Sequence, residues 1–448
     1  MRRAWLGIWL WGLLPLTGVT QTTALAPATR PALDSAACLA RARARIEVLC
    51  SDSLAGRGYA LQGHRKAAGW IAEELSAVGL SPQTDRFTFA LNRVTGARLQ
   101  VGGETLTYGR DFLVSGPSGP LVGTYPVIDL GHGLPSQWQR LRPRVPGSLV
   151  VLRPGLPQGH GLPDSLARLY GAEITQLSLA LQLGGVGVIW LRPKLTAGFA
   201  TEAYPLAVLE VQDSIWRPAT PEVELALATG VDEITSQNVW ALVPGAVSPD
   251  TVVVLTAHYD HLGRVEGATF RGASDNASGV AFLLALADSL VRHPPRYSTL
   301  LLATGAEEVG LVGSQSFVER LEGRSLRRDG PYVLGVLNFD LMGNGEAGLV
   351  AVAGQTYPRL YTAFEAALRQ RAPTLRLRAR ENRPNSDHWP FTQVGIPALF
   401  LYTEGGPPNY HDIYDTPDQL GLPVFYPVLA SVVGFLHRPG LAQIFLSP

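Results

Sequence analysis

Short apolar runs alternate with helix-like segments over the second half of the chain. The runs are residues 252–255, 300–303, 333–339 and 397–401. They are almost continuously apolar, which is typical of strands that are buried on both faces of a mostly parallel sheet. Residues 278–291, 314–321 and 358–370 lie between them and carry apolar residues at helical spacing. The pattern predicts an α/β fold with a mostly parallel central sheet that is flanked by helices.

The first half of the chain divides into a part that predicts helices and a part with many Pro and Gly residues and short strands. Residues 34–49 and 61–78 predict helices, and Gly79 ends the second of them. From residue 92 to residue 232, Pro and Gly are frequent and the predicted strands are short. The predicted strands are 126–130, 148–152 and 186–191, with a helix at 172–183. We therefore expect a smaller α/β domain at 92–232, inserted between residues 27–91 and 233–448 of the main domain.

The N-terminus has the features of a targeting segment. Arg2 and Arg3 precede an apolar run at 4–19, which is shorter than the roughly 20 residues of a spanning helix. This pattern predicts a signal peptide, assigned to residues 1–26, and a secreted or periplasmic protein with no stable membrane insertion after its removal. An uncleaved membrane anchor is the alternative interpretation.

Composition narrows the possible partners. The 448 residues include 37 basic and 37 acidic side chains, so an electrostatic grip of the whole protein on nucleic acid is not expected. Of the two cysteines, Cys38 lies within the helix predicted at 34–49 and Cys50 follows it, so a continuous helix between them would hold them roughly 18 Å apart. Because a disulfide needs Cα atoms within about 7 Å, we expect two free thiols.

Polar residues follow each of the four apolar runs. Because the carboxyl ends of parallel strands meet at one edge of a sheet, these residues are expected to converge there. The candidate set is His258, Asp275, Glu308, Asp340 and His411. Imidazole nitrogen and carboxylate oxygen are ligands of Zn²⁺, and a shared carboxylate can bridge two ions. The set therefore predicts a site for two zinc ions.

Several of these residues also have simpler interpretations when taken singly. Asp275 precedes a predicted helix and could be its cap, and His258 could be a structural histidine. Asp260 lies two residues after His258 and, on an extended strand, would accept its second imidazole N–H. The adjacent Glu307 and Glu308 repel each other unless a cation lies nearby, which allows one to bind a metal and the other to accept a proton.

These motifs together resemble the co-catalytic dizinc exopeptidases, the family of secreted bacterial leucyl aminopeptidases and of glutamate carboxypeptidases. The resemblance covers residues 35–90 and 237–433. The matching motifs are Leu54-Ala-Gly-Arg57, His258-Tyr-Asp260, Asp275-Asn-Ala-Ser-Gly279, Glu307-Glu308, Asp340, Ser386-Asp-His-Trp-Pro-Phe391 and Tyr410-His411. The inserted region resembles a protease-associated domain at 147–152 and 170–191, which either limits access to the site or is a passive insertion.

The resemblance implies a role for each residue of the site. Asp275 would bridge the two zinc ions, with His258 and Asp340 on one ion and Glu308 and His411 on the other. Glu307 would be the general base and Tyr410 the hydroxyl that stabilises the oxyanion. Asp387 and His388 would line the substrate pocket.

The activity that the resemblance implies is zinc-dependent removal of N-terminal residues from peptides. A carboxypeptidase and a single-zinc glutaminyl cyclase are alternatives on the same scaffold. A third alternative, of another class, is a binding module in which the inserted domain captures a ligand and the metal is structural. Closed structural zinc sites are usually rich in cysteine, and this set contains none.

Overall fold

A computed structural model describes residues 35–217, 220–325 and 332–446, without the side chains of 322–325. The predicted signal peptide lies outside the described residues. Cys38 and Cys50 are both buried and free, as predicted. Among the helices that the structure describes, none is long and apolar enough to cross a membrane.

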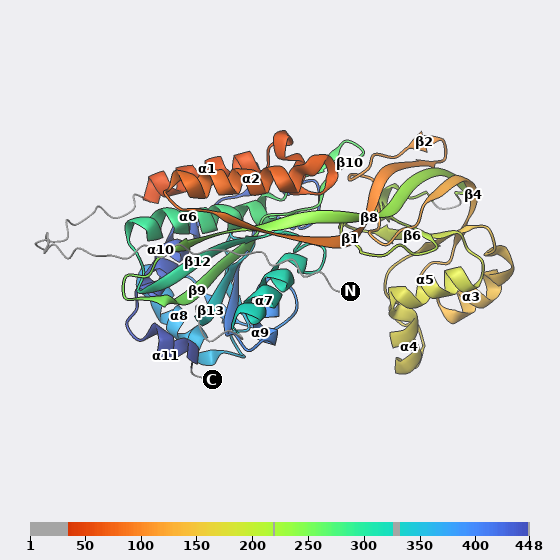
Figure 1. The fold of residues 1–448 in the computed structure, drawn as a ribbon. Helices are drawn as coiled ribbons and strands as arrows, with labels where there is room; N and C mark the ends of the chain where they lie inside the picture. Colours follow the sequence, from red (N-terminus) through yellow and green to blue (C-terminus); the bar gives the residue numbers. More distant parts are fainter. Residues whose placement is uncertain (1–34, 218–219, 326–331, 447–448) are drawn as a thin grey trace, which may run out of the picture. The chain divides into compact units, whose positions relative to one another are not determined.

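The centre of the fold is a mixed sheet in which the four predicted strands lie side by side and parallel (Figure 1). In spatial order they are β16 (Ala398–Glu404), β13 (Tyr332–Phe339), β9 (Ser248–His258) and β12 (Tyr297–Thr304). In register, Leu399 pairs with Leu337, which pairs with Leu255, which pairs with Leu301. Two further strands, β14 (Gly348–Val352) and β15 (Leu377–Ala379), extend the sheet beyond β16. The predicted fold class is confirmed.

Helices cover both faces of this sheet, which explains the runs of consecutive apolar residues in its central strands. One face packs on α1 (Ser35–Leu49), α2 (Gly63–Ala77), α6 (Gly279–Arg292), α8 (Pro358–Arg371), α10 (Phe425–Leu436) and α11 (Leu441–Leu446). The other packs on α7 (Val312–Ser325) and α9 (His388–Gln393). In β9, Val253 and Leu255 join the first apolar cluster, whereas Val252 and Val254 join the second. Each face of the strand therefore contributes to a separate core.

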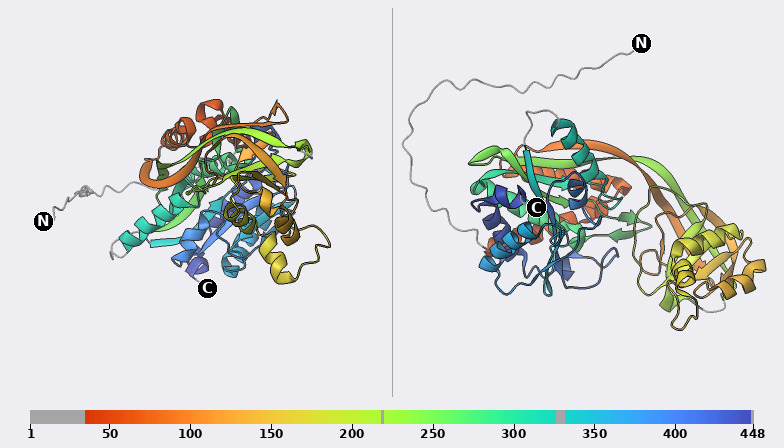
Figure 2. Two further views of the ribbon diagram at one scale, coloured as in Figure 1. Left: turned by 90° about the vertical axis from the view of Figure 1, so that its right-hand side faces the viewer. Right: turned by 90° about the horizontal axis from the view of Figure 1, so that it is seen from below.

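A long antiparallel ribbon connects this sheet to the middle of the chain, and it was not predicted. It consists of β1 (Gln83–Val101) and β8 (Glu222–Val243), which pair along their length and stay side by side in all views (Figures 1 and 2). Near one end β8 pairs with β12, and near the other it pairs with β4 (Leu121–Asp129). The expected domain boundaries lie opposite each other in this ribbon, where Leu91 pairs with Asp232.

Beyond the ribbon, a second α/β unit contains the strands and the helix expected there. Its sheet contains β3 (Phe112–Val114), β4, β5 (Leu149–Leu152), β6 (Gly187–Arg192) and β7 (Ala207–Gln212). Its helices are α3 (Pro135–Leu141), α4 (Asp164–Gly171) and α5 (Glu173–Gln182). One apolar cluster lies wholly within this region, but another includes Leu262 and Phe270 from the main domain. The two regions therefore share part of their core.

A buried arginine holds the main domain together behind the carboxyl ends of the strands. Arg57 is completely buried, and the five hydrogen bonds that its guanidinium donates all go to backbone carbonyl oxygens at 2.7–3.3 Å. The acceptors belong to Leu49, Tyr259, Arg271, Gly272 and Asp275. The planar fork of an arginine can reach several acceptors at once, which a lysine cannot. Arg57 therefore joins α1, the end of β9 and the segment before α6.

Substitution of Arg57 is expected to destabilise the protein strongly. Arg57→Met leaves five buried carbonyl groups without this donor, so the free energy of unfolding should fall by about 3 kcal/mol or more. Arg57→Lys should recover only part of this loss. Arg65→Met, which changes an exposed arginine of α2, is the control and should shift it by less than about 0.5 kcal/mol. Chemical denaturation measures all three, and equal values for Arg57→Met and Arg65→Met would contradict the prediction.

Candidate functional site

The predicted site residues meet at one edge of the sheet because the strands that precede them are parallel. His258 is the last residue of β9, and Glu307 and Glu308 follow β12. Asp340 follows β13, and His411 lies on the loop after β16. Asp275 belongs to η5 (Ala273–Ser278), an irregular turn that leads into α6. The structure therefore brings together side chains that are spread over about 150 residues of sequence.

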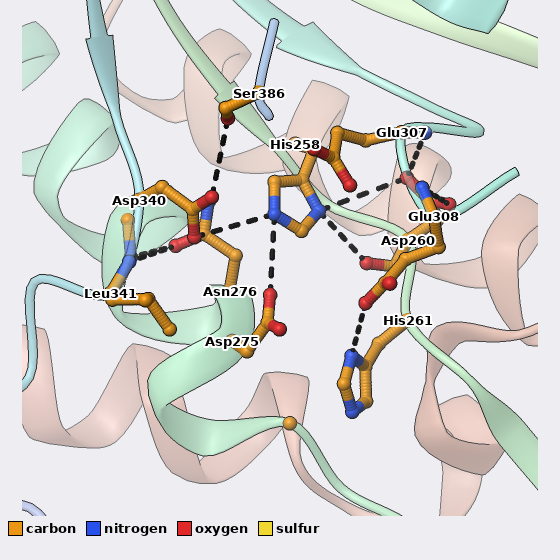
Figure 3. Close-up of polar contacts among 12 residues, drawn as sticks. His258, Asp260, His261, Asp275, Asn276, Glu307, Glu308, Asp340, Leu341 and Ser386 are labelled. Carbon is orange, nitrogen blue, oxygen red and sulfur yellow. Dashed lines mark hydrogen bonds and ion pairs between the residues drawn. The ribbon is translucent and has the colours of Figure 1, made fainter. Parts of the chain in front are cut away.

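Asp275 lies between two imidazole rings. Its Oδ1 is 3.3 Å from Nε2 of His258, and its Oδ2 is 3.0 Å from Nε2 of His411. Figure 3 shows His258 at the centre of the set, facing Asp275 and Asp340 through one nitrogen and Asp260 through the other. A carboxylate that offers one oxygen to each of two separate groups has the geometry that a bridging ligand needs.

The other two acids divide between the same two rings. Asp340 Oδ1 lies 3.4 Å from His258 Nε2, and Glu308 Oε2 lies 3.0 Å from His411 Nε2. Both Nε2 atoms and Asp340 Oδ1 are buried and make no hydrogen bond within the described part of the chain. Buried polar atoms rarely lack such partners. Converging nitrogen and oxygen atoms without partners are what a cation site requires.

Charge supports the same conclusion. Six carboxylates gather here: Asp260, Asp275, Glu307, Glu308, Asp340 and Asp387. Among the residues that the structure describes, every ion pair of these acids is with a histidine, and none is with lysine or arginine. Like charges packed out of water are costly without a compensating cation. The donor set therefore fits one or more divalent metal ions.

The pKa values within the set diverge according to these contacts. Burial alone would raise the pKa of Asp275, but His258 and His411 hold it well below the ordinary range. Burial opposes His411 protonation, yet Glu308 and Asp275 raise the pKa of His411 to about 11. Asp275 thus stays charged in a buried position because positive or donor groups surround it.

Glu307 differs from its neighbour Glu308. Burial, with the negative charges of Asp387 and Glu308 adding to it and His258 opposing it, raises the pKa of Glu307 well above its ordinary value. The pKa of Glu308 falls to about 2, because His411 and His261 outweigh its burial. A carboxyl group with a raised pKa can accept and release a proton near neutral pH, whereas a fully charged one is suited to bind a cation.

The predicted role of Asp260 was wrong in its detail. Nδ1 of His258 lies 3.2 Å from the backbone oxygen of Asp260, whereas the carboxylate is 3.9 Å away. The strand ends at His258, so the side-chain alternation on which the prediction depended does not reach Asp260. The carboxylate instead accepts hydrogen bonds from the Glu307 amide at 3.0 Å and the Tyr59 hydroxyl at 3.0 Å. Asp260 therefore holds the turn that carries the two glutamates.

Asp387 and His388, the predicted pocket residues, lie in the interior of the protein. Both are completely buried, and the Thr304 hydroxyl donates to the Asp387 carboxylate. His388 Nε2 lies 3.1 Å from the side-chain oxygen of Asn382. Neither residue is part of the lining of the cavity beside Glu308. Asp387 acts on the site through its charge on Glu307.

Sequence reasoning missed His261. Its ring is completely buried, and Nδ1 donates to Glu308 Oε1 at 2.7 Å. Glu308 thus offers one oxygen to His261 and the other to His411. The sequence did contain a signal, because His261 directly follows the motif His258-Tyr-Asp260.

Sequence reasoning also missed the residues that hold Asp275 in place. The carboxylate of the buried Asp415 accepts the backbone N–H groups of Ser274 at 2.8 Å and Asp275 at 3.0 Å. Arg57 donates to the carbonyl oxygens of Gly272 and Asp275 from the other side. The negative Asp415 therefore binds the N–H groups of this short turn, and the positive Arg57 binds its carbonyl oxygens. Neither partner could be assigned from spacing, because Arg57 is 218 residues before Asp275 and Asp415 is 140 residues after it.

Three residues at this edge of the sheet have a strained backbone conformation. Ala306, Leu341 and His411 have positive φ angles of 58°, 53° and 58°, although none is glycine. Each lies within the site or directly beside one of its carboxylates. Such conformations cost about 1–3 kcal/mol each and persist only where the surroundings enforce them, often at functional sites.

Tyr410 stacks on His411, with ring centroids 3.8 Å apart and an interplanar angle of 13°. Its side chain is still partly exposed. Burial and the charges of Asp275 and Glu308 raise the pKa of Tyr410, so its hydroxyl keeps its proton. The phenol therefore remains a hydrogen-bond donor beside the acidic set.

A cavity of about 330 Å³ opens beside Glu308. Its lining consists of Pro117, Phe199, Ala200, Thr201, Glu202, Tyr204, Glu308, Val309 and Gly310. Glu202 is exposed and makes no hydrogen bond or ion pair with any other described residue. The lining thus contains two acids, no basic residue and two aromatic rings.

Comparison with known proteins identifies the family. Residues 238–428 match the model of peptidase family M28. This region is an M28 peptidase domain. The match begins in β8 and contains every residue of the candidate site from His258 to His411. The protein is therefore a zinc-dependent metallopeptidase.

Relatives and solved structures agree with this assignment. The chain is 26% identical over 407 residues to the "Probable lipoprotein aminopeptidase LpqL" of Mycobacterium tuberculosis, covering 81% of this chain and 77% of that protein. It is 29% identical to aminopeptidase YwaD of Bacillus subtilis, over only 41% of this chain and 40% of that one.

The fold of the chain is that of solved zinc aminopeptidases. BSAP, a zinc aminopeptidase from Bacillus subtilis, superposes with a TM-score of 0.71, covering 89% of this chain and 94% of that one at 20% identity. An aminopeptidase from Aneurinibacillus sp. strain AM-1 gives a TM-score of 0.62 over 90% and 94% at 21% identity. Both likenesses cover the ribbon and the second α/β unit as well as the peptidase domain.

Removal of zinc is expected to destabilise the folded protein, because it leaves the buried carboxylates to repel one another. Zinc at 100 times its dissociation constant should stabilise the fold by about 2.7 kcal/mol. Thermal unfolding of the purified protein, compared before and after treatment with a chelator, measures the difference. Added zinc should restore the melting temperature, and identical transitions with and without chelator would contradict the prediction.

Proposed function

We propose that the M28 peptidase is an aminopeptidase that removes N-terminal residues from peptides. The observation that carries the proposal is the cavity beside Glu308, whose lining contains Glu202 and Glu308 but no lysine or arginine. A free α-ammonium group is attracted to such a cavity, whereas a C-terminal carboxylate is repelled. Relatives named as aminopeptidases support the same direction.

We propose that the site binds two zinc ions, one beside His258 and the other beside His411. Asp275 would bridge them, because its two oxygens face different imidazoles at 3.3 Å and 3.0 Å. His258 and Asp340 would complete one site, and Glu308 and His411 the other. When bound, zinc would polarise the scissile carbonyl and lower the pKa of water.

Glu307 is proposed as the general base. Its amide is fixed by Asp260 at 3.0 Å, but its carboxylate accepts no hydrogen bond within the described part of the chain. Glu307 would take a proton from the attacking water and return it to the departing amine nitrogen. The tyrosine hydroxyl of Tyr410, which stays protonated, would donate a hydrogen bond to the developing oxyanion.

The alternatives are less well supported. A carboxypeptidase would need a cation for the substrate's carboxylate, and the cavity lining offers none. A single-zinc cyclase would not need Asp275 to face two imidazoles. A binding module with a structural metal would not need a glutamate with a raised pKa beside the ligands.

We also propose that residues 92–232 act as an inserted, protease-associated-like domain and that the protein is extracytoplasmic. The first proposal is supported by the separate apolar cluster of that region. The second is supported by the N-terminal sequence pattern and by the name of the lipoprotein relative.

Glu307→Gln should separate catalysis from metal binding. The amide cannot accept the proton, so kcat should fall by about 10²- to 10⁴-fold. Zinc content, measured by elemental analysis, should stay at two ions per chain because Glu307 is not among the proposed ligands. Glu307→Asp, which retains a base at a greater distance, should retain more activity than Glu307→Gln. Wild-type turnover in Glu307→Gln would remove this residue as the base.

Glu202→Gln tests the direction of cleavage. Loss of the charge should raise KM for free-amine peptides about fivefold, roughly 1 kcal/mol for an exposed pair, with little effect on kcat. The measurement is steady-state kinetics on a panel of dipeptides and tripeptides with free and acetylated N-termini. Wild-type enzyme should cleave the free peptides and leave the acetylated ones intact.

Glu233→Gln is the matched control, because Glu233 is an exposed glutamate on β8 that does not line the cavity. It should leave KM unchanged. Cleavage of acetylated peptides at their C-terminal residue would overturn the aminopeptidase proposal in favour of a carboxypeptidase.

A further inference from the structure

We infer that residues 194–197 of the inserted region form part of the active site, with Lys194 as a positioning residue for His411. The inference rests on the zinc site of the proposed function. It assigns the insertion a role in metal binding that is distinct from limiting access to the site.

The first observation is a pair of hydrogen bonds between His411 and Ala197. The Ala197 amide donates to the backbone oxygen of His411 at 2.9 Å, and the ring nitrogen Nδ1 of His411 lies 2.9 Å from the Ala197 backbone oxygen. A carbonyl oxygen can only accept, so Nδ1 carries the proton. Nε2 is therefore the ring nitrogen that faces Asp275 and Glu308 and that would bind a metal ion.

The second observation is the contact of Lys194 with both neighbours of His411. Its ammonium donates to the backbone oxygen of Tyr410 at 2.7 Å and lies 3.5 Å from Oδ2 of Asp412. Lys194 therefore spans the backbone segment that carries His411. It is one of only two lysines among the 37 basic residues, the other being Lys66.

The third observation is that His411 cannot hold this position alone. Its φ of 58° is a costly backbone conformation for a residue with a side chain, and it lies on a loop outside the strands and helices. Within the described residues, its Nδ1 has Ala197 as its hydrogen-bond partner, and its other ring contacts are Tyr410, His261 and the two carboxylates. Tyr410, His261 and Ala197 therefore hold the imidazole from outside the proposed ligand set, and Ala197 is the residue that fixes the proton on Nδ1.

The same segment continues into the cavity wall. Phe199, Glu202 and Tyr204 lie shortly after Ala197 in the sequence and line the cavity beside Glu308. Zinc affinity at the His411 site and the binding of substrate are consequently expected to respond together when this segment is disturbed. A passive insertion has no such coupling.

Lys194→Met tests the inference on the full-length protein. Partners that orient a metal ligand typically contribute 10- to 100-fold in affinity. We expect one of the two zinc ions to bind about tenfold more weakly, the other to be unchanged, and kcat/KM to fall at limiting zinc. Lys194→Arg, which retains the charge, should restore most of the affinity. Titration of the zinc-free protein against a competing chelator measures both sites without recourse to activity.

Lys66→Met is the matched control, since Lys66 is exposed on α2 away from the site, and it should leave both affinities unchanged. The melting temperature of zinc-free Lys194→Met should equal that of the zinc-free wild type. A lowered melting temperature of the zinc-free variant would indicate a general structural role and overturn the inference, as would two unchanged zinc affinities. Wild-type protein that binds no zinc would instead overturn the proposed function, and the inference with it.

Discussion

An excess of buried negative charge is the main feature of the sheet edge at which the parallel strands end. Four carboxylates and three imidazoles meet there, whereas Arg57, behind the turn of Asp275, donates hydrogen bonds to backbone oxygens. Bringing such groups together costs free energy that apolar packing elsewhere must offset. A divalent cation bound between the carboxylates would turn this repulsion into attraction. Metal binding and stability are therefore linked in this protein.

The residues around the site are mainly hydrogen-bond donors, which stabilise its negative charge. Donors hold the carboxylates and their turns, as Ser386 does for Asp340 and His261 does for Glu308. Arg57 satisfies the carbonyl oxygens behind Asp275, so that the carboxylate can face forward. The strained residues follow the same logic, because left-handed backbone at Ala306 turns the chain sharply before Glu307.

The sequence predicted the parts of this structure that depend on short-range pattern. Strands β9, β12, β13 and β16 each contain a run of consecutive apolar residues because helices cover both faces, and that feature is visible in the residues themselves. The convergence of His258, Asp340 and His411 followed from parallel strands. The β1–β8 ribbon was missed because its apolar positions alternate with polar ones and lie within a stretch rich in Gly and Pro. Its existence depends on pairing between segments about 140 residues apart.

Prediction failed where a role depends on which atom of a residue is used. Asp260 is at the expected place, but its backbone oxygen contacts His258 while its carboxylate turns to Tyr59 and Glu307. Likewise, nothing in the spacing of Ala197 indicates that its carbonyl oxygen orients His411 from another region of the chain. Side-chain identity can be read from a sequence, but backbone groups are the same at every position. Where backbone atoms orient the ligands of a site, as the oxygens of Asp260 and Ala197 do here, those contacts cannot be predicted from the sequence.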